Sequence, residues 1–325
     1  MFDASYDVVI CGGGVAGAAA ALASARRGRK TALIEKTVLS GGLATTGLIY
    51  IYLPLCDGNG TQVLFGIAEE LLLASLKYGP GEVPDWRKGK NAEEAKRYRV
   101  IFSPASFTLA IDELLIDAGV DVWYDTLICA SVVEGGRLAA VEVENKSGRG
   151  RMHAHCFVDA TGDADVAHFA GLHCPTAENA MAIWVLEYAK GAQWRLEKSI
   201  ESVSLHAGGG SIDKKEYPAG IDGATVTRFI LDGRKKYLAR LKEGYASGKH
   251  TRTSLFPLML PSMAQFRTTR HIPAQYKLRD SEDWKHFDDS IGMTADWRKP
   301  GYVWEIPYRS MLPVGLKNLV AEGRC

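Results

Sequence analysis

A glycine motif near the start of the chain carries the clearest chemical signal. Gly12, Gly14 and Gly17 fill the spacing G-x-G-x-x-G directly after a short apolar run. Where a strand passes into a helix, this spacing is typical of proteins that bind the pyrophosphate of a dinucleotide. An acid, Glu35, follows at about the distance where such proteins use a carboxylate to hold the ribose hydroxyls. These residue types therefore predict a bound dinucleotide and the redox chemistry that it supplies.

Each residue of this motif has a separate physical task. Gly12 permits the tight turn out of the strand, Gly14 lets the pyrophosphate approach the backbone, and Gly17 lets the helix pack close to the strand. The N–H groups and the positive dipole end of the following helix then face the phosphates. A carboxylate at Glu35 repels a 2′-phosphate and so disfavours NADP. The motif by itself does not distinguish FAD from NAD.

A βαβ unit is required to position these residues. Tyr6–Cys11 and Thr31–Glu35 have the apolar composition of buried strands, and Ala18–Arg27 is an alanine-rich helix between them. The loop after the second strand combines Gly41 and Gly42 with small hydroxyl residues. That composition suits a backbone that lies against a ligand.

The next part of the chain predicts helices and an antiparallel meander. Helices are expected over Ile67–Tyr78 and Pro104–Ala118, and strands over Val120–Tyr124, Leu127–Glu134, Arg137–Glu144 and Arg151–Asp159. The last three strands are joined by Gly135-Gly136 and by a second glycine-containing turn, and both indicate hairpins. A further helix is expected to begin near Asp163, with Asp163 or Asp165 as its cap.

The composition changes after about residue 175, where the βαβ pattern ends and Lys, Arg, Trp and Tyr become frequent. We expect an α/β fold: residues 1–175, rejoined by 301–325, form a Rossmann-like cofactor domain with a parallel sheet and an antiparallel β-meander. Residues 176–300 form a mixed α+β substrate or cap domain. Within it, Asp222–Tyr245 predicts an amphipathic helix with the inward residues Phe229, Ile230, Tyr237, Leu238 and Leu241. Its outer face is interpreted as a solvated surface in preference to a nucleic-acid site; it comprises Arg234, Lys235, Lys236, Arg240 and Lys242.

Composition and charge narrow the class of protein. The 325 residues carry a net charge of +1, which implies no strong attraction to nucleic acid or to acidic membranes. No charge-free apolar run of about 18 residues occurs, and the N-terminus lacks the basic region of a signal peptide. A cytoplasmic protein without a membrane partner is therefore expected. The six cysteines show no CxxC spacing, and His153 and His155 have no third ligand in view, so no metal site is predicted.

Taken together, the motifs resemble a known family. The glycine unit with Glu35 is followed by "SGGLATTG", "DATGDADVAHFAG", "FRTTRHI" and "IPYRSMLPVGLKNLVAEGRC". This combination is similar to the FAD-dependent oxidoreductases, which have a glutathione-reductase-like FAD domain. Fumarate reductase flavoproteins and tRNA-modifying flavoproteins are more distant relatives. The resemblance covers nearly the whole chain and specifies no substrate.

The resemblance implies FAD as the cofactor and assigns residues to it. The three motif glycines would lie on the pyrophosphate and Glu35 on the adenosine ribose. The loop of residues 41–45 would run along the diphosphate and ribityl chain, and Ile128 or Cys129 would meet adenine. The residues predicted to bind the cofactor are Gly12, Gly14, Val15, Ala16, Gly17, Glu35, Lys36, Gly41, Gly42, Ala44, Thr45, Ile128, Cys129, Thr161, Gly162 and Asp163.

The chain departs from the family pattern in two places. Covalent fumarate and succinate flavoproteins carry a flavin-bonding histidine just before the second glycine loop, where this chain has Val38-Leu39-Ser40. Noncovalent FAD is therefore expected. The family chains also continue beyond the final Gly-Arg-Cys into a helix whose dipole stabilises charge on the reduced flavin. This sequence stops at Cys325, so a truncated product or a fragment is expected.

The segment "FRTTRHI" supplies the candidate catalytic groups beside the flavin. Arg267 and Arg270 could grip a substrate carboxylate, and His271 could move a proton near neutral pH. The alternatives are an interdomain salt bridge for the arginines and a surface position for the histidine.

The sequence therefore predicts an oxidoreductase that transfers a hydride between noncovalent FAD and a small organic substrate. The electron donor or acceptor and the oligomeric state are left open. Two alternatives differ in class: a tRNA-modifying flavoprotein, and a non-catalytic, truncated FAD-binding remnant. The small net charge and the absence of a basic patch with interleaved aromatic residues disfavour the first.

Overall fold

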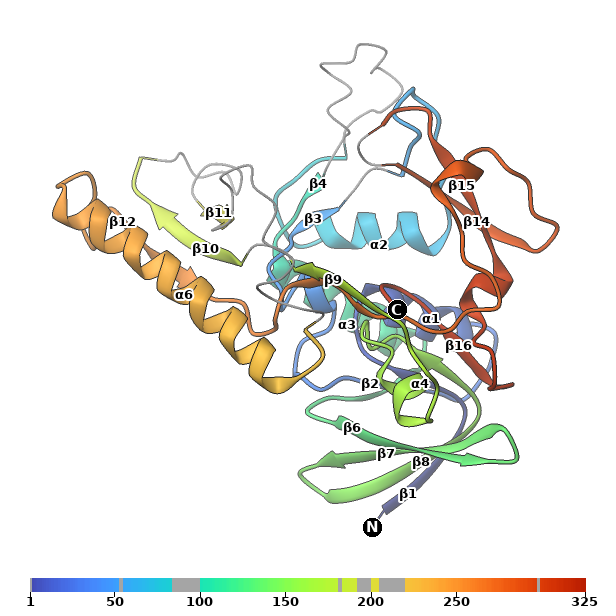
Figure 1. Ribbon diagram of the computed structural model, residues 1–325. Coiled ribbons are helices and arrows are strands. Elements are labelled where there is room, and N and C mark those ends of the chain that lie inside the picture. The colour runs from blue at the N-terminus through green and yellow to red at the C-terminus, as the bar shows by residue number, and fades with distance from the viewer. Residues whose placement is uncertain are drawn as a thin grey trace.

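A mixed sheet of seven strands forms the centre of the protein (Figure 1). The computed structural model describes residues 2–52, 55–83, 100–180, 183–191, 200–204, 220–296 and 299–325. In spatial order the sheet contains β5 (Asp121–Trp123), β2 (Thr31–Ile34), β1 (Phe2–Cys11), β8 (Gly148–Asp159), β7 (Arg137–Asn145) and β6 (Leu127–Glu134), with β16 (Leu319–Ala321) as a second partner of β8.

Strand β8 changes partner along its length. Residues 148–153 pair antiparallel with β7, whereas residues 157–159 pair in parallel with β16. Strands β5, β2, β1, β8 and β16 therefore run parallel and end at one edge. The β6–β7 hairpin turns through Gly135 and Gly136, which both have positive φ, as a two-residue hairpin of this type requires. The predicted α/β class, with a parallel sheet and an antiparallel meander, is confirmed.

Helices and other elements cover both faces of the parallel part of the sheet, because successive side chains of a strand point to opposite faces and both faces are apolar here. On one face, Ile10 of β1 packs in a buried cluster with side chains of α1 (Val15–Ala25), α2 (Ile67–Leu76) and α3 (Pro104–Asp117). On the other face, Val9 and Cys11 pack with side chains of the meander and of α4 (Asp165–Phe169).

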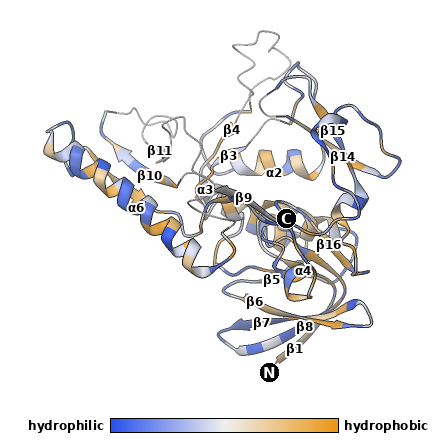
Figure 2. Cartoon of the chain, in the orientation of Figure 1, coloured by the Kyte–Doolittle hydropathy of each residue, from blue (hydrophilic) through white to orange (hydrophobic). Residues whose placement is uncertain are grey.

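A second, smaller unit projects to one side in Figure 1. The long helix α6 (Gly223–Ala246) lies beside a three-stranded sheet of β11 (Ile200–Ser204), β10 (Trp184–Ala189) and β12 (Leu255–Met259). Hydrophobic and hydrophilic residues alternate along α6 (Figure 2). Phe229, Tyr237 and Leu241 are buried as predicted, but Leu238 is 49% exposed. The prediction for Leu238 was wrong because its position on the helix points away from the sheet that α6 covers.

Further strands of the described part of the chain form short two-stranded sheets. They are β9 (Thr176–Ala180) with β13 (Phe266–Arg270), β14 (Ser290–Ala295) with β15 (Val303–Pro307), and β3 (Ile51–Tyr52) with β4 (Val100–Ile101). Single 3-10 turns occur at η1 (Gly42–Ala44), η2 (Asp280–Glu282) and η3 (Tyr308–Met311). The β14–β15 pair lies across the boundary that we expect at residue 300, whereas β16 returns to the central sheet.

Two classes of feature are absent from the described part of the chain. None of its helices combines the length and the apolar composition that crossing a membrane requires. No three of its His, Cys, Asp or Glu side chains are grouped so that they could hold a metal ion.

Candidate functional site

A cleft of about 400 Å³ lies along the edge where the parallel strands end. Each of the five parallel strands contributes the residues that follow it, an arrangement that α/β sheets commonly use to bind ligands. These residues are Gly12, Gly14, Val15 and Ala16 after β1; Glu35, Lys36 and Thr37 after β2; Thr126 after β5; Ala160, Thr161 and Gly162 after β8; and Gly323 and Arg324 after β16. The cleft is therefore a product of the sheet topology.

In the first glycine turn, Gly12 and Gly17 pack against neighbouring backbone, whereas Gly14 faces the cleft. Gly12 has φ of +111°, and a Cβ there would lie 2.4 Å from the carbonyl oxygen of Ala160. A Cβ at Gly17 would lie 1.9 Å from the carbonyl oxygen of Gly12. Gly17 does not line the cleft, and its lack of a side chain instead lets α1 approach the turn.

Gly14 differs from these two glycines because it faces open space. A Cβ at Gly14 would meet no atom of the protein within 4 Å, and its φ of −64° is accessible to any residue. Gly14 is also the N-cap of α1, which has neither a side-chain cap nor an acid in its first turn. Backbone N–H groups and the positive end of the helix dipole therefore face the cleft.

Glu35 fastens two loops at the edge of the cleft. Its Oε2 accepts a hydrogen bond of 2.8 Å from the backbone N–H of Gly13. Its Oε1 accepts hydrogen bonds from the backbone N–H and the hydroxyl of Thr37, at 2.8 and 2.9 Å. Each carboxylate oxygen has more than one acceptor direction, so the side chain can hold both turns and still accept from a ligand.

The second glycine loop is held from behind by Ser40. The buried Ser40 hydroxyl donates to Asp112 Oδ1 at 2.9 Å and also bonds the hydroxyl of Tyr124. The backbone N–H of Gly41 donates to the carbonyl of Gly13 at 2.8 Å. Burial and the neighbouring Asp112 raise the pKa of Tyr124 above its ordinary value, so its hydroxyl keeps its proton. This anchoring sets the path of the loop along the cleft.

A buried carboxylate organises the turn between β8 and α4. Asp159 has no solvent exposure, and it accepts hydrogen bonds from the Thr161 hydroxyl at 2.7 Å and from the Ala167 N–H at 3.0 Å. Burial raises the pKa of Asp159 although these hydrogen bonds oppose the shift. The Thr161 hydroxyl also accepts from the N–H of Asp165 at 3.0 Å. Neither Asp163 nor Asp165 caps α4, contrary to prediction: its N-cap is Ala164 in a left-handed conformation, and Asp159 and Thr161 satisfy the N–H groups instead.

Most residues predicted to bind the cofactor line the cleft. These are Gly12, Gly14, Val15, Ala16, Glu35, Lys36, Gly41, Gly42, Ala44, Ile128, Thr161 and Gly162. Four others do not line it. Besides Gly17, they are Thr45, whose hydroxyl donates to the carbonyl of Ser40 at 2.6 Å, Cys129, whose thiol contacts the carbonyl of Leu127, and Asp163, which is paired with Arg324.

None of the three predicted catalytic residues lines the cleft. Arg267 is exposed on β13. Arg270 forms an ion pair with Asp165 and donates to the carbonyl of Asp163 at 2.9 Å, which matches the salt-bridge alternative. Burial and the nearby Lys277 lower the pKa of His271, so the neutral imidazole is favoured at neutral pH.

Several lining residues were missed from the sequence. They are Ile34, Thr37, Thr46, Ile49, Ile51, Thr126, Leu127, Ala160, Asp165, Met263, Gly323 and Arg324, whereas Leu43 belongs to the loop 41–45 that was predicted to follow the cofactor. Arg324 could have been found by recognising 319–321 as a strand, because residues directly after parallel strands meet at one edge. Met263 had no such signal, since it reaches the cleft from the second unit.

Glu322, next to this edge, provides a pH test. Its Oε1 is buried and has no hydrogen-bond partner among the described residues, and burial raises the pKa of this carboxyl to about 8. The unfolded chain releases this proton near pH 4.3, at roughly the ordinary glutamate value. The native state thus binds more protons between these values, so the free energy of unfolding should fall as pH rises from about 5 to 8. We expect Glu322→Gln to flatten the dependence of melting temperature on pH, whereas Glu134→Gln, at the exposed end of β6, should not. If the melting temperature of Glu322→Gln changed with pH as steeply as that of the unchanged chain, the Glu322 carboxyl would not be buried as described.

Comparison with known proteins gives one family and several relatives. The model of a family described as FAD dependent oxidoreductase matches residues 7–183. The digeranylgeranylglycerophospholipid reductase of Picrophilus torridus is 28% identical over 174 residues, which are 52% of this chain and 43% of that protein. This chain thus spans less than half the length of that reductase.

Solved structures with a related arrangement are more distant. A geranylgeranyl bacteriochlorophyll reductase-like protein from Thermoplasma acidophilum is 22% identical, with 57% of this chain and 47% of that chain covered and a TM-score of 0.42. The L-proline dehydrogenase from P. horikoshii is 14% identical, with 59% and 63% covered and a TM-score of 0.41.

Proposed function

The chain belongs to the family of FAD dependent oxidoreductases, and we propose that it transfers a hydride between noncovalently bound FAD and a small organic substrate. FAD is the cofactor of this family, and it supplies the hydride-transfer chemistry when it is bound. The observation that carries the proposal is the cleft itself, which joins the open side of Gly14, the uncapped start of α1 and the Glu35 carboxylate.

The residues around the cleft fit FAD. Lys36 and Arg324 contribute two positively charged residues to the lining of the cleft, and these charges complement a diphosphate. Gly14 leaves room for the phosphates, and Glu35 offers acceptors to ribose hydroxyls. The volume of about 400 Å³ lies within the range of small-molecule and cofactor sites.

The remaining wall suits the flat flavin ring, whose dimethylbenzene part is apolar. Leu43, Ala44, Ile49, Ile51 and Met263 line this part of the cleft. Apolar side chains exclude water from a ring and strengthen the electrostatic interactions around it. Met263 comes from the second unit, so we propose that the substrate enters between that unit and the central sheet.

We propose the substrate only as a class, a small organic molecule. The similarity to the P. torridus reductase covers about half of this chain, so it supports the redox class and does not select a substrate. Arg267 and His271 remain our predictions for substrate contacts, because they lie on or next to β13, the strand that Arg324 joins to the cleft.

Anaerobic reduction of the FAD-loaded chain tests the proposed function. Loaded protein is mixed with candidate hydride donors of several classes, including hydroxy acids, amino acids and reduced nicotinamides, and the visible absorbance of oxidised flavin is followed. Substrate-dependent bleaching of bound flavin is the expected result. Failure of the chain to take up FAD under any loading condition would contradict the proposal.

Release of flavin on denaturation tests the noncovalent state. Since no histidine stands before the second glycine loop, acid precipitation should leave all flavin in the supernatant and none with the pelleted protein. Digestion of the pellet and measurement of flavin fluorescence in its peptides provides the check. A flavin-labelled peptide would show a covalent bond and overturn this part of the proposal.

A further inference from the structure

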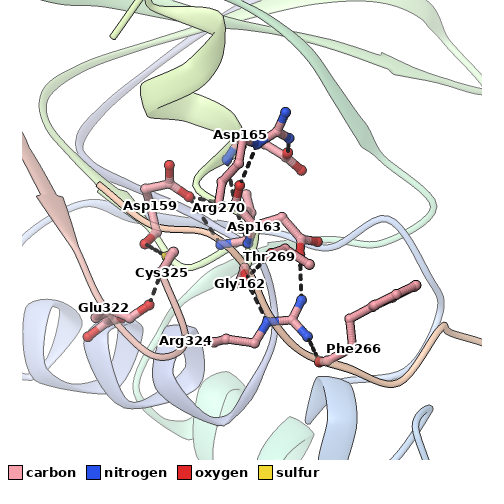
Figure 3. A network of polar contacts seen from close by, with 11 residues as sticks. Asp159, Gly162, Asp163, Asp165, Phe266, Thr269, Arg270, Glu322, Arg324 and Cys325 are labelled. Carbon is pink, nitrogen blue, oxygen red and sulfur yellow. Dashed lines mark hydrogen bonds and ion pairs between the residues drawn. The ribbon is translucent and has the colours of Figure 1, made fainter. Parts of the chain in front are cut away.

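Arg324 joins three segments that are far apart in the sequence (Figure 3). Its Nε donates to the carbonyl of Gly162 at 2.6 Å, in the turn after β8. One Nη donates to Asp163 Oδ1 at 2.6 Å, and the other donates to the carbonyl of Phe266 at the start of β13. The side chain is only 15% exposed. One guanidinium therefore ties the end of β16 to the β8–α4 turn and to β13.

Asp163 strengthens this connection from the other side. Its Oδ1 accepts from the hydroxyl of Thr269 as well as from Arg324, both at 2.6 Å, and its carbonyl accepts from Arg270. Arg270 also pairs with Asp165, a residue of the cleft wall. Strand β13 is thus bound to the cofactor edge by the Arg270–Asp165 ion pair, by the bond from Arg324 to the Phe266 carbonyl and by the bond from Thr269 to Asp163.

Strand β13 leads from this edge into the core of the second unit. The side chain of Phe266 is 3% exposed and its ring centroid lies 4.6 Å from that of Phe229 on α6. Phe266 therefore contacts Arg324 through its carbonyl and α6 through its ring. Because buried side chains pack closely, a shift of the Phe266 backbone must also move its ring against α6.

Arg324 also faces the space that a ligand would occupy. It lines the cleft, and a guanidinium carries five N–H donors. Three are used in the contacts above, and the other two have no acceptor among the residues that the structure describes. A diphosphate in the cleft would be attracted to this charge and could accept from those donors.

We propose that Arg324 is a positioning residue that couples occupancy of the cleft by a diphosphate-bearing cofactor to the placement of β13 and α6. The inference rests on the proposed function, because it takes FAD as the occupant. When the diphosphate fixes the guanidinium, the bonds to Phe266 and Asp163 hold β13 in one position against the cleft. Thermodynamic linkage makes this effect reciprocal. If bound FAD favours the fixed position of β13 by a given factor, then a change that abolishes this fixed position lowers the affinity for FAD by the same factor.

Hydrogen exchange of the β13 amides, measured with and without saturating FAD, tests this coupling. In the unchanged chain, FAD is expected to slow exchange over residues 266–270 about tenfold. In Arg324→Gln the slowing should disappear even when FAD occupancy is restored by a higher concentration. Arg324→Lys retains the charge but lacks the planar fork, so it should bind FAD more tightly than Arg324→Gln and still fail to protect β13. Lys317→Gln, an exposed substitution before β16, should behave as the unchanged chain.

FAD affinity is measured separately by quenching of flavin fluorescence. This measurement distinguishes failure of the proposed function from failure of the coupling. If the unchanged chain binds no FAD, the proposed function fails. If it binds FAD and β13 exchange does not respond, or responds equally in Arg324→Gln, only the coupling is overturned. Should Arg324→Gln not fold, Thr269→Val removes a bond to Asp163 from the β13 side without altering the cleft. That variant is expected to lose part of the protection and to bind FAD more weakly by the corresponding factor, and full protection there would contradict the proposal.

Discussion

A Gly14→Val variant is expected to fold normally and to bind FAD about 100-fold more weakly, a loss of about 2.7 kcal/mol in binding free energy. The backbone at Gly14 is in a region that valine can adopt, and a Cβ there would touch no protein atom within 4 Å. The added side chain therefore enters only the cleft, where it occupies the space proposed for the pyrophosphate. Titration of the apoprotein with FAD, combined with a melting curve without FAD, measures both parts of the prediction.

Gly17→Val is the matched variant for this experiment. A Cβ at Gly17 would lie 1.9 Å from the carbonyl oxygen of Gly12, so α1 would have to move away from the turn. We expect a loss of about 3 kcal/mol or more in the free energy of unfolding. Equal effects of the two substitutions on the stability of the apoprotein, or normal FAD affinity in Gly14→Val, would contradict the assignment of the cleft.

An Arg240→Ala variant is expected to lower the free energy of unfolding of the second unit by about 2 to 3 kcal/mol. Glu187 on β10 has no solvent exposure, and Arg240 of α6 donates to both of its oxygens at 2.8 Å. Without Arg240 the buried carboxylate keeps a hydrogen bond of 3.0 Å from the Tyr237 hydroxyl but loses its positive partner. We place the effect at the lower end for buried ion pairs because the Arg240 side chain is 40% exposed. Denaturant unfolding monitored by tryptophan fluorescence measures it.

Two further variants give this prediction its controls. Lys235→Ala removes an exposed charge from the same helix and should change stability by less than about 0.5 kcal/mol. The double variant Glu187→Gln with Arg240→Ala removes the buried charge as well, so it should recover part of the loss. If Arg240→Ala and Lys235→Ala were equally stable, the buried carboxylate of Glu187 would not need the positive charge of Arg240.

Local patterns in the sequence were sufficient for the cofactor unit. The strand, glycine turn, helix, strand and acid between Tyr6 and Glu35 occur as predicted, although α1 begins at Val15, earlier than expected. The meander strands were also located, because apolar alternation and paired glycines act within a few residues of each other. These features depend on backbone geometry and on neighbours close in the chain. The family resemblance rests on the same residues and agrees with the match over 7–183.

The tertiary structure alone decided how remote charges are paired. From the sequence, Arg270 was equally suited to a substrate carboxylate or a salt bridge, and its partner Asp165 lies more than 100 residues earlier in the chain. Likewise, Arg324 enters the cleft because β16 pairs with the last part of β8, a contact between segments that are far apart in the chain. The pairing of Arg240 with the buried Glu187 has the same origin, since helical periodicity gives the face of a residue but not its partner on another element. The sequence by itself therefore determined the elements and the cofactor class, whereas the three-dimensional packing determined which charges meet, because that depends on contacts between distant segments.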